Sequence, residues 1–233
     1  MGAREDDADG TGRLPDQVPL FPLPGHVFLP GLPYPYRVFE LRYQALVDHL
    51  LDLPADSRWL SIPLLASDSA EAADPTPAFT RIATLGRLAD WTRLPNGHSL
   101  IVVHGERRVR LTEVPSGWPF RLARVEPWPD LVPPPADDEL GTRFSALRQL
   151  LASLTVYLGP AGKELAGLVE GCDDPDRCTF RLAAALLAEP AATQELLETR
   201  SLASRIDVVE GILAAALAAA HEGAGGRPAF PRS

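Results

Sequence analysis

The stretch that decides the fold reads Val18-Pro19-Leu20-Phe21-Pro22-Leu23-Pro24, then Val27-Phe28-Leu29-Pro30-Gly31, then Tyr34-Pro35-Tyr36-Arg37-Val38-Phe39-Glu40-Leu41-Arg42-Tyr43. Its prolines lack a backbone N–H and are therefore confined to strand edges, bulges and turns. Pro30-Gly31 predicts a sharp reversal between two extended segments. After Phe39 the apolar residues recur at helical spacing. Residues 18–51 therefore predict a strand, a proline-bent corner, a second strand and a short helix.

The rest of the first half predicts a mostly antiparallel β domain with one or two short helices. Leu94-Pro95-Asn96-Gly97-His98 is a hairpin turn, because Asn-Gly tolerates the positive φ that such turns need. A strand follows at 100–103, Gly105 predicts a second reversal, and apolar and polar residues then alternate over 108–114 as in a half-buried strand. Further strands are predicted at 58–65 and 120–125.

The second half is predicted to be helical. Apolar residues repeat with a period near 3.6 over 140–158, 174–187, 190–197 and 202–220, which favours a small antiparallel helix bundle. We therefore expect an α+β protein, with a β-rich domain at 14–128 and a helical bundle at 139–221. A Pro-rich linker, 129–138, separates the two. Disordered tails are expected at 1–13 and 222–233.

The motifs in this order resemble the N-terminal, substrate-binding domain of the ATP-dependent Lon proteases. The segments that carry the resemblance are Val18–Leu23, Val27–Gly31, Phe39–Tyr43, Leu85–Leu88, Leu94–Gly97, Gly105–Leu111 and Leu196–Thr199 with Leu202, Arg205 and Ile206. The resemblance covers about residues 14 to 221. It implies a PUA-like β pseudobarrel followed by a helical bundle. Because the sequence shows no ATPase or protease module of the family, we expect a stand-alone domain.

Composition and motifs argue against nucleic-acid binding, nucleotide binding and peptidase activity. A net charge of −9 argues against a nucleic-acid partner. Gly159-Pro160-Ala161-Gly162-Lys163-Glu164 fails as a phosphate-binding loop, because the glycines are too close and Glu164 replaces the Ser or Thr that meets magnesium. Lys163 is the only lysine and lacks the serine context of a Ser-Lys dyad. We expect no catalytic residue, no cofactor and no metal site.

The lack of a targeting signal and the small number of cysteines predict a protein of a reduced compartment. The N-terminus shows no signal pattern, and no apolar run reaches membrane-spanning length. Cys172 and Cys178 are too few for a disulfide framework, and we expect them to be separate thiols in a cytoplasmic protein.

Three functions remain as hypotheses. The first is a non-catalytic module, an adaptor or a recogniser of unfolded polypeptide that works alone or beside a separate protease or ATPase. Its contact residues are Phe28, Leu29, Tyr34 and Tyr36, which form either an exposed patch or a lid on the core, whereas Phe21 and Phe39 are expected in the core. The second is a PUA-like RNA-binding module that uses Arg107, Arg108, Arg110, Arg121 and Arg124. The third, disfavoured, is an ATP-dependent serine peptidase. The oligomeric state has no signal in the sequence.

Overall fold

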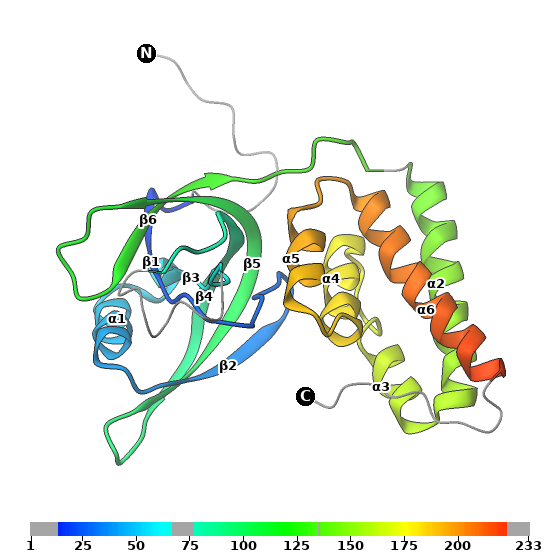
Figure 1. Cartoon of the computed structure of the whole chain (residues 1–233), viewed down its shortest axis with the longest axis horizontal. Coiled ribbons are helices and arrows are strands. Elements are labelled where there is room, and N and C mark those ends of the chain that lie inside the picture. Colours follow the sequence, from blue (N-terminus) through cyan, green and yellow to red (C-terminus); the bar gives the residue numbers. More distant parts are fainter. Residues whose placement is uncertain (1–13, 67–76, 135, 223–233) are drawn as a thin grey trace.

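The computed structural model describes residues 14–66, 77–134 and 136–222. The tails expected at 1–13 and 222–233 lie outside these residues, apart from Glu222, which ends the last helix. Figure 1 shows two parts side by side, a β-rich subdomain and a helical subdomain. The protein is therefore an α+β protein, as predicted from the sequence.

One curled sheet forms the β subdomain. Its strands are β1 (Gln17–Leu20), β2 (Pro33–Val38), β3 (Trp59–Ser61), β4 (Ile82–Arg93), β5 (Ser99–Val114) and β6 (Arg121–Pro127). The strand order is β2-β5-β4-β3-β1-β6, and β6 also pairs with β5, which closes the sheet on itself. All pairings between these strands are antiparallel except that of β1 with β3. Helix α1 (Leu41–Leu51) and the 3-10 helix η1 (Ala55–Ser57) complete the subdomain.

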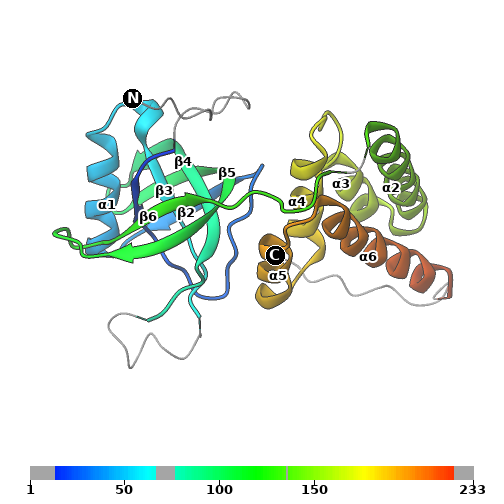
Figure 2. The ribbon, with the colours of Figure 1, turned by 90° about the horizontal axis from the view of Figure 1, so that it is seen from above.

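The helical subdomain contains α2 (Asp137–Leu158), α3 (Pro160–Gly167), α4 (Pro175–Leu186), α5 (Pro190–Glu198) and α6 (Leu202–Glu222). Three of these helices have proline in the first turn, where a backbone N–H would have no acceptor within the helix, so proline costs no hydrogen bond. Helix α6 lies along α2, and α4 and α5 face the β subdomain (Figure 2). Helix α1 lies at the opposite side of the sheet from the bundle.

The predicted reversal at Gly105 is wrong. Strand β5 is 16 residues long and continues across Gly105 without a turn. A Cβ atom at Gly105 would lie 2.2 Å from the carbonyl oxygen of Leu29. Glycine inside a strand often marks the close approach of another backbone, and here that backbone belongs to the proline corner. The amide of Gly31 donates to Gly105 O at 2.9 Å, and the amide of Gly105 donates to Leu32 O at 3.0 Å.

The predicted turn at residues 94–98 is confirmed. Gly97 has a φ of +82°, and the amide of Leu94 donates to His98 O at 2.8 Å. The predicted succession of strand, corner, strand and helix over residues 18–51 is also confirmed, as β1, the corner, β2 and α1. The corner is thus fixed between two strands of one sheet.

Candidate functional site

The proline corner, residues 21–32, joins the hydrophobic core of the helical subdomain to one of the two core clusters of the β subdomain. Val27 and Leu29 pack into the core of the helical subdomain, whereas Phe28 packs into the core of the β subdomain. Successive side chains of an extended segment point in opposite directions, so one short stretch serves both cores. The Phe28 ring occupies the space above Gly86, where a Cβ would lie 2.6 Å from it. The corner therefore belongs to the joint between the subdomains.

This burial decides between the two readings of the corner. Phe28 is 1% exposed and Leu29 is 0% exposed, so both side chains belong to the core and neither is available as a binding surface. Phe21 lies in the core, as expected. The expectation for Phe39 is wrong, because it is 60% exposed. It follows the last residue of β2 and lies next to His98 at the end of the β4–β5 hairpin, beyond the reach of the core.

Tyr34 and Tyr36 form the accessible part of the predicted site. Both are half-buried on β2, and their rings lie nearly parallel with centroids 6.3 Å apart. His26, from the corner, meets both rings edge-on. Its Nε2 lies 2.8 Å from the hydroxyl oxygen of Tyr36. The sequence does not single out His26, because only the fold of the corner brings its ring against residues eight and ten positions later.

This aromatic cluster, His26, Tyr34 and Tyr36, is uncharged near neutral pH. Burial lowers the pKa of His26, so the imidazole stays neutral. Burial also raises the pKa of Tyr34 to about 12 and raises the pKa of Tyr36 further. A neutral surface of rings suits apolar and amide groups better than ions.

A cavity of about 170 Å³ lies between this cluster and the helices. His26, Val27, Leu29 and Tyr34 form its β-side wall. Its other wall comes from the end of α4, the α4–α5 connection and the start of α5, through Ala184, Leu187, Ala188, Pro190 and Thr193. Pockets for whole small molecules usually measure about 300–1,000 Å³. The volume of this cavity suits a single side chain.

A second feature of the joint is a buried charge network. The guanidinium of Arg108 donates to the Asp130 carboxylate and, at 2.7 Å, to Thr199 O. Arg205 donates to both Asp130 oxygens at 2.8 and 2.9 Å and to Asp176 at 2.6 Å. Arg108 is 8% exposed and Arg205 is 0% exposed. The network links β5, the chain after β6, α4 and α6, and it borders a cleft of about 530 Å³ between the subdomains.

The predicted basic patch is therefore dispersed. Arg108 is buried and donates its hydrogen bonds within the charge network, so its assignment to the basic patch is wrong. Arg121 pairs with Glu113 through two hydrogen bonds of 2.6 and 2.7 Å. Arg110 is exposed and stacks on the Trp128 ring, with Glu126 directly opposite it in the β5–β6 register. Arg124 is exposed on β6, and Arg107 is half-buried beside the cleft. This mixed-sign arrangement lacks the concentrated positive charge that phosphate binding needs.

The pH dependence of stability tests the charge network through Asp130. Burial alone would raise the pKa of Asp130, but hydrogen bonds and charges of Arg205 and Arg108 hold it below its ordinary value of 3.8. A depressed folded-state pKa gives stability that is present above the unfolded value and lost as the pH falls through the folded-state value. We expect Asp130→Asn to destabilise the protein at neutral pH, with a difference from the parent that shrinks below about pH 4. Urea titrations between pH 7 and pH 3 measure this, and a difference that stays constant would contradict it.

This arrangement, a closed sheet joined through a buried corner to a helix bundle, is the architecture of the Lon protease N-terminal domain. The structure resembles the "N terminal domain of Mycobacterium avium complex Lon protease", with a TM-score of 0.63 over 85% of this chain and 98% of that chain, at 20% identity. It also resembles a Lon N-terminal domain protein from Xanthomonas campestris, with a TM-score of 0.53 over 84% and 97% of the two chains, at 23% identity. These likenesses establish the fold.

The chain belongs to the family of ATP-dependent protease La (LON) substrate-binding domains, whose model matches residues 17–215. The Lon protease of Phenylobacterium zucineum is 28% identical over 212 residues, which are 90% of this chain and 26% of that protein. The chain thus spans about a quarter of the length of the curated relatives it matches. The family match covers the substrate-binding domain, and the match includes neither the ATPase nor the protease domain.

Within residues 14–66, 77–134 and 136–222, no helix has both the length and the apolar character needed to cross a bilayer. No group of three or more His, Cys, Asp or Glu side chains there is placed to hold a metal ion.

Proposed function

We propose that the chain binds extended polypeptide, without chemistry of its own, by placing one apolar side chain in the cavity between the aromatic cluster and α4–α5. The observation that carries the proposal is this cavity, about 170 Å³ in volume and bordered by the uncharged His26 and Tyr34. Membership of a substrate-binding family supports it. Leu29 and Tyr34 line the cavity, and Phe28 packs edge-on against the Tyr34 ring. Tyr36, which stacks beside Tyr34, extends the contact surface next to the cavity.

Recognition through side chains fits the edge of the sheet better than addition of a strand. Strand β2 pairs with β5 alone among the described strands. Pro33 and Pro35 have no N–H, so the hydrogen bonds of that pairing come from Tyr34 and Tyr36. The backbone positions that face outward are then Pro33, Pro35 and Arg37, and the two prolines cannot donate to an added strand. A bound polypeptide therefore gains most of its affinity from side-chain contacts.

Filling the cavity is the sharpest test of this function. Ala184 is exposed and lines the cavity, so Ala184→Phe places a ring where the polypeptide side chain would lie, without disturbing the core. We expect the affinity for a fluorescently labelled, permanently unfolded protein such as reduced, alkylated casein to fall at least about tenfold, because the anchoring side chain loses its pocket. Fluorescence anisotropy titration measures the affinity.

The neighbouring Ala185 provides the matched control. It is exposed on the same helix and does not line the cavity. Ala185→Phe should bind like the parent. Equal loss in both variants, or no binding by the parent protein, would reject the cavity as the site.

The absence of catalysis is part of the proposal and has its own measurement. Lys163, the only lysine, is exposed on the short helix α3, far in sequence from the aromatic cluster. We expect no release of peptides from casein by the purified chain, with or without ATP. An adaptor role, in which the bound polypeptide passes to a separate protease or ATPase, extends the same proposal and is checked by co-purification.

A further inference from the structure

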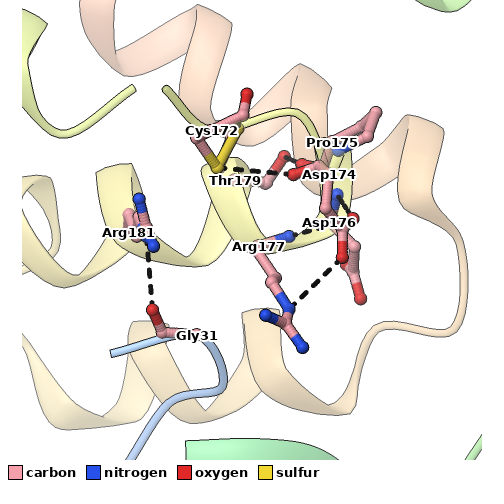
Figure 3. The surroundings of a disulfide bond; sticks show 9 residues. Gly31, Cys172, Asp174, Pro175, Asp176, Arg177, Thr179 and Arg181 are labelled. Carbon is pink, nitrogen blue, oxygen red and sulfur yellow. Dashed lines mark hydrogen bonds and ion pairs between the residues drawn. A yellow bond between two sulfur atoms is a disulfide. The ribbon is translucent and has the colours of Figure 1, made fainter. Parts of the chain in front are cut away.

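The two cysteines meet at the start of α4. Cys172 lies in the α3–α4 connection and Cys178 in the first turns of α4, and the structure joins their sulfur atoms in a disulfide (Figure 3). Their Cα atoms are 5.9 Å apart, which lies within the range of about 4.4–6.8 Å that disulfides span. The expectation of two separate thiols is therefore wrong. The helix that begins at Pro175 turns Cys178 back toward Cys172, and spacing along the sequence does not show this.

Residues 173–177, the segment between the two cysteines, contact both the charge network and the proline corner. Asp174 caps α4, since its Oδ1 accepts from the amide of Asp176 at 2.9 Å. Asp176 accepts from the buried Arg205 of the charge network at 2.6 Å. Arg177 packs against Gly31, where a Cβ would lie 3.2 Å from the Arg177 Cβ. One turn further on, Arg181 Nε donates to Gly31 O at 3.2 Å, as Figure 3 shows.

We propose that Cys172 and Cys178 form a thiol-oxidation site whose disulfide staples residues 173–177 against the proline corner and the charge network. The oxidant is a small-molecule disulfide. One cysteine thiolate attacks it and releases one small thiol, and the second cysteine then attacks the mixed disulfide and releases the other. The protein loses two protons and two electrons, and the small disulfide is reduced to two thiols. A dithiol reductant reverses the reaction.

The cysteines are buried but the connection around them is exposed, and this determines how the disulfide and dithiol states differ. Cys172 is 6% exposed and Cys178 is 1% exposed, so exchange with a small disulfide needs local opening. The neighbouring Gly171, Asp173 and Asp174 are exposed, which makes opening of this short connection easier than opening of a helix. Closing a short loop removes conformations from its opened state, so the disulfide suppresses opening and the dithiol permits it.

The experiment compares the full chain after treatment with glutathione disulfide and after treatment with dithiothreitol. Mass spectrometry after thiol alkylation reports the redox state. Because the chain contains two cysteines, any disulfide within one chain must join Cys172 to Cys178. Hydrogen–deuterium exchange then reports the opening of residues 173–177 and of the corner around Gly31. We expect oxidation to slow exchange at 173–177 at least about tenfold and to protect the Gly31 region to a smaller extent.

Two results would overturn the proposal. One is alkylation of both thiols in the folded protein after treatment with glutathione disulfide. The other is formation of the disulfide with unchanged exchange at 173–177, which would make the pair a passive contact. The Cys172→Ala, Cys178→Ala double variant is the control, and its exchange should not respond to either treatment. Comparison of the two redox states of the parent protein does not depend on that variant's folding.

Discussion

Replacing Arg205 by alanine is expected to lower the free energy of unfolding by about 3 kcal/mol. The Arg205 side chain is completely buried, and it bridges Asp130 of the segment after β6 to Asp176 of α4. Its removal leaves these two carboxylates facing each other without their shared cation. Breaking a buried pair from one side usually costs about 3–5 kcal/mol, and the lower end applies because both carboxylates keep partial access to water.

Urea unfolding followed by circular dichroism measures this loss. The matched control is Arg93→Ala, which removes an arginine whose ion pair with Asp48 is largely exposed. That variant should change the free energy of unfolding by less than about 1 kcal/mol. Equal effects of the two variants would show that the charge network contributes no more than an ordinary surface pair. Arg205→Met, which keeps most of the volume, separates loss of charge from loss of packing.

Gly105→Ala is expected to destabilise the protein by a similar amount, about 3 kcal/mol. The new methyl group would lie 2.2 Å from Leu29 O, a backbone atom that cannot rotate away. Relief requires the corner to move off β5, which breaks the two hydrogen bonds between Gly105 and the corner. The same movement would pull Phe28 and Leu29 out of the two cores that they fill.

Gly117→Ala is the control for this substitution. Gly117 lies in the exposed β5–β6 connection, and a Cβ there has nothing within 4 Å. Its φ is outside the left-handed region. The free energy of unfolding of Gly117→Ala should stay within about 0.5 kcal/mol of the parent value in the same urea titration. A tolerated Gly105→Ala would mean that the corner does not press on β5 as the structure shows.

Periodicity was enough to predict most of the fold. The helical stripes gave the bundle, because an amphipathic helix shows its buried face at a fixed spacing. The turn at 94–98 was predictable because its conformation is local: Pro95 and Asn96 occupy a turn closed by the Gly97 amide on Leu94 O, and Gly97 follows with a positive φ. The reversal at Gly105 was mispredicted, since glycine marks both turns and close backbone contacts, and the contact partner lies more than seventy residues earlier.

The candidate site was only partly predictable. Tyr34 and Tyr36 were selected from the sequence, whereas His26, Ala184 and Leu187 were not, because the walls of the cavity come from segments about 150 residues apart. Arg108 was assigned to a basic patch because it sits among other arginines. Its true partners, Asp130 and the carbonyl of Thr199, are brought to it by the packing of the subdomains.

The sequence by itself determined most of the elements of this protein, their order and its family, because these follow from local spacing and from ordered motifs. Only the tertiary structure decided what the stretch at the proline corner does. An extended segment exposes one face or buries both depending on what packs against each side. Here a sheet packs on one side and a helix bundle on the other. Phe28 and Leu29 therefore became core, and the accessible surface was left to Tyr34, Tyr36 and His26.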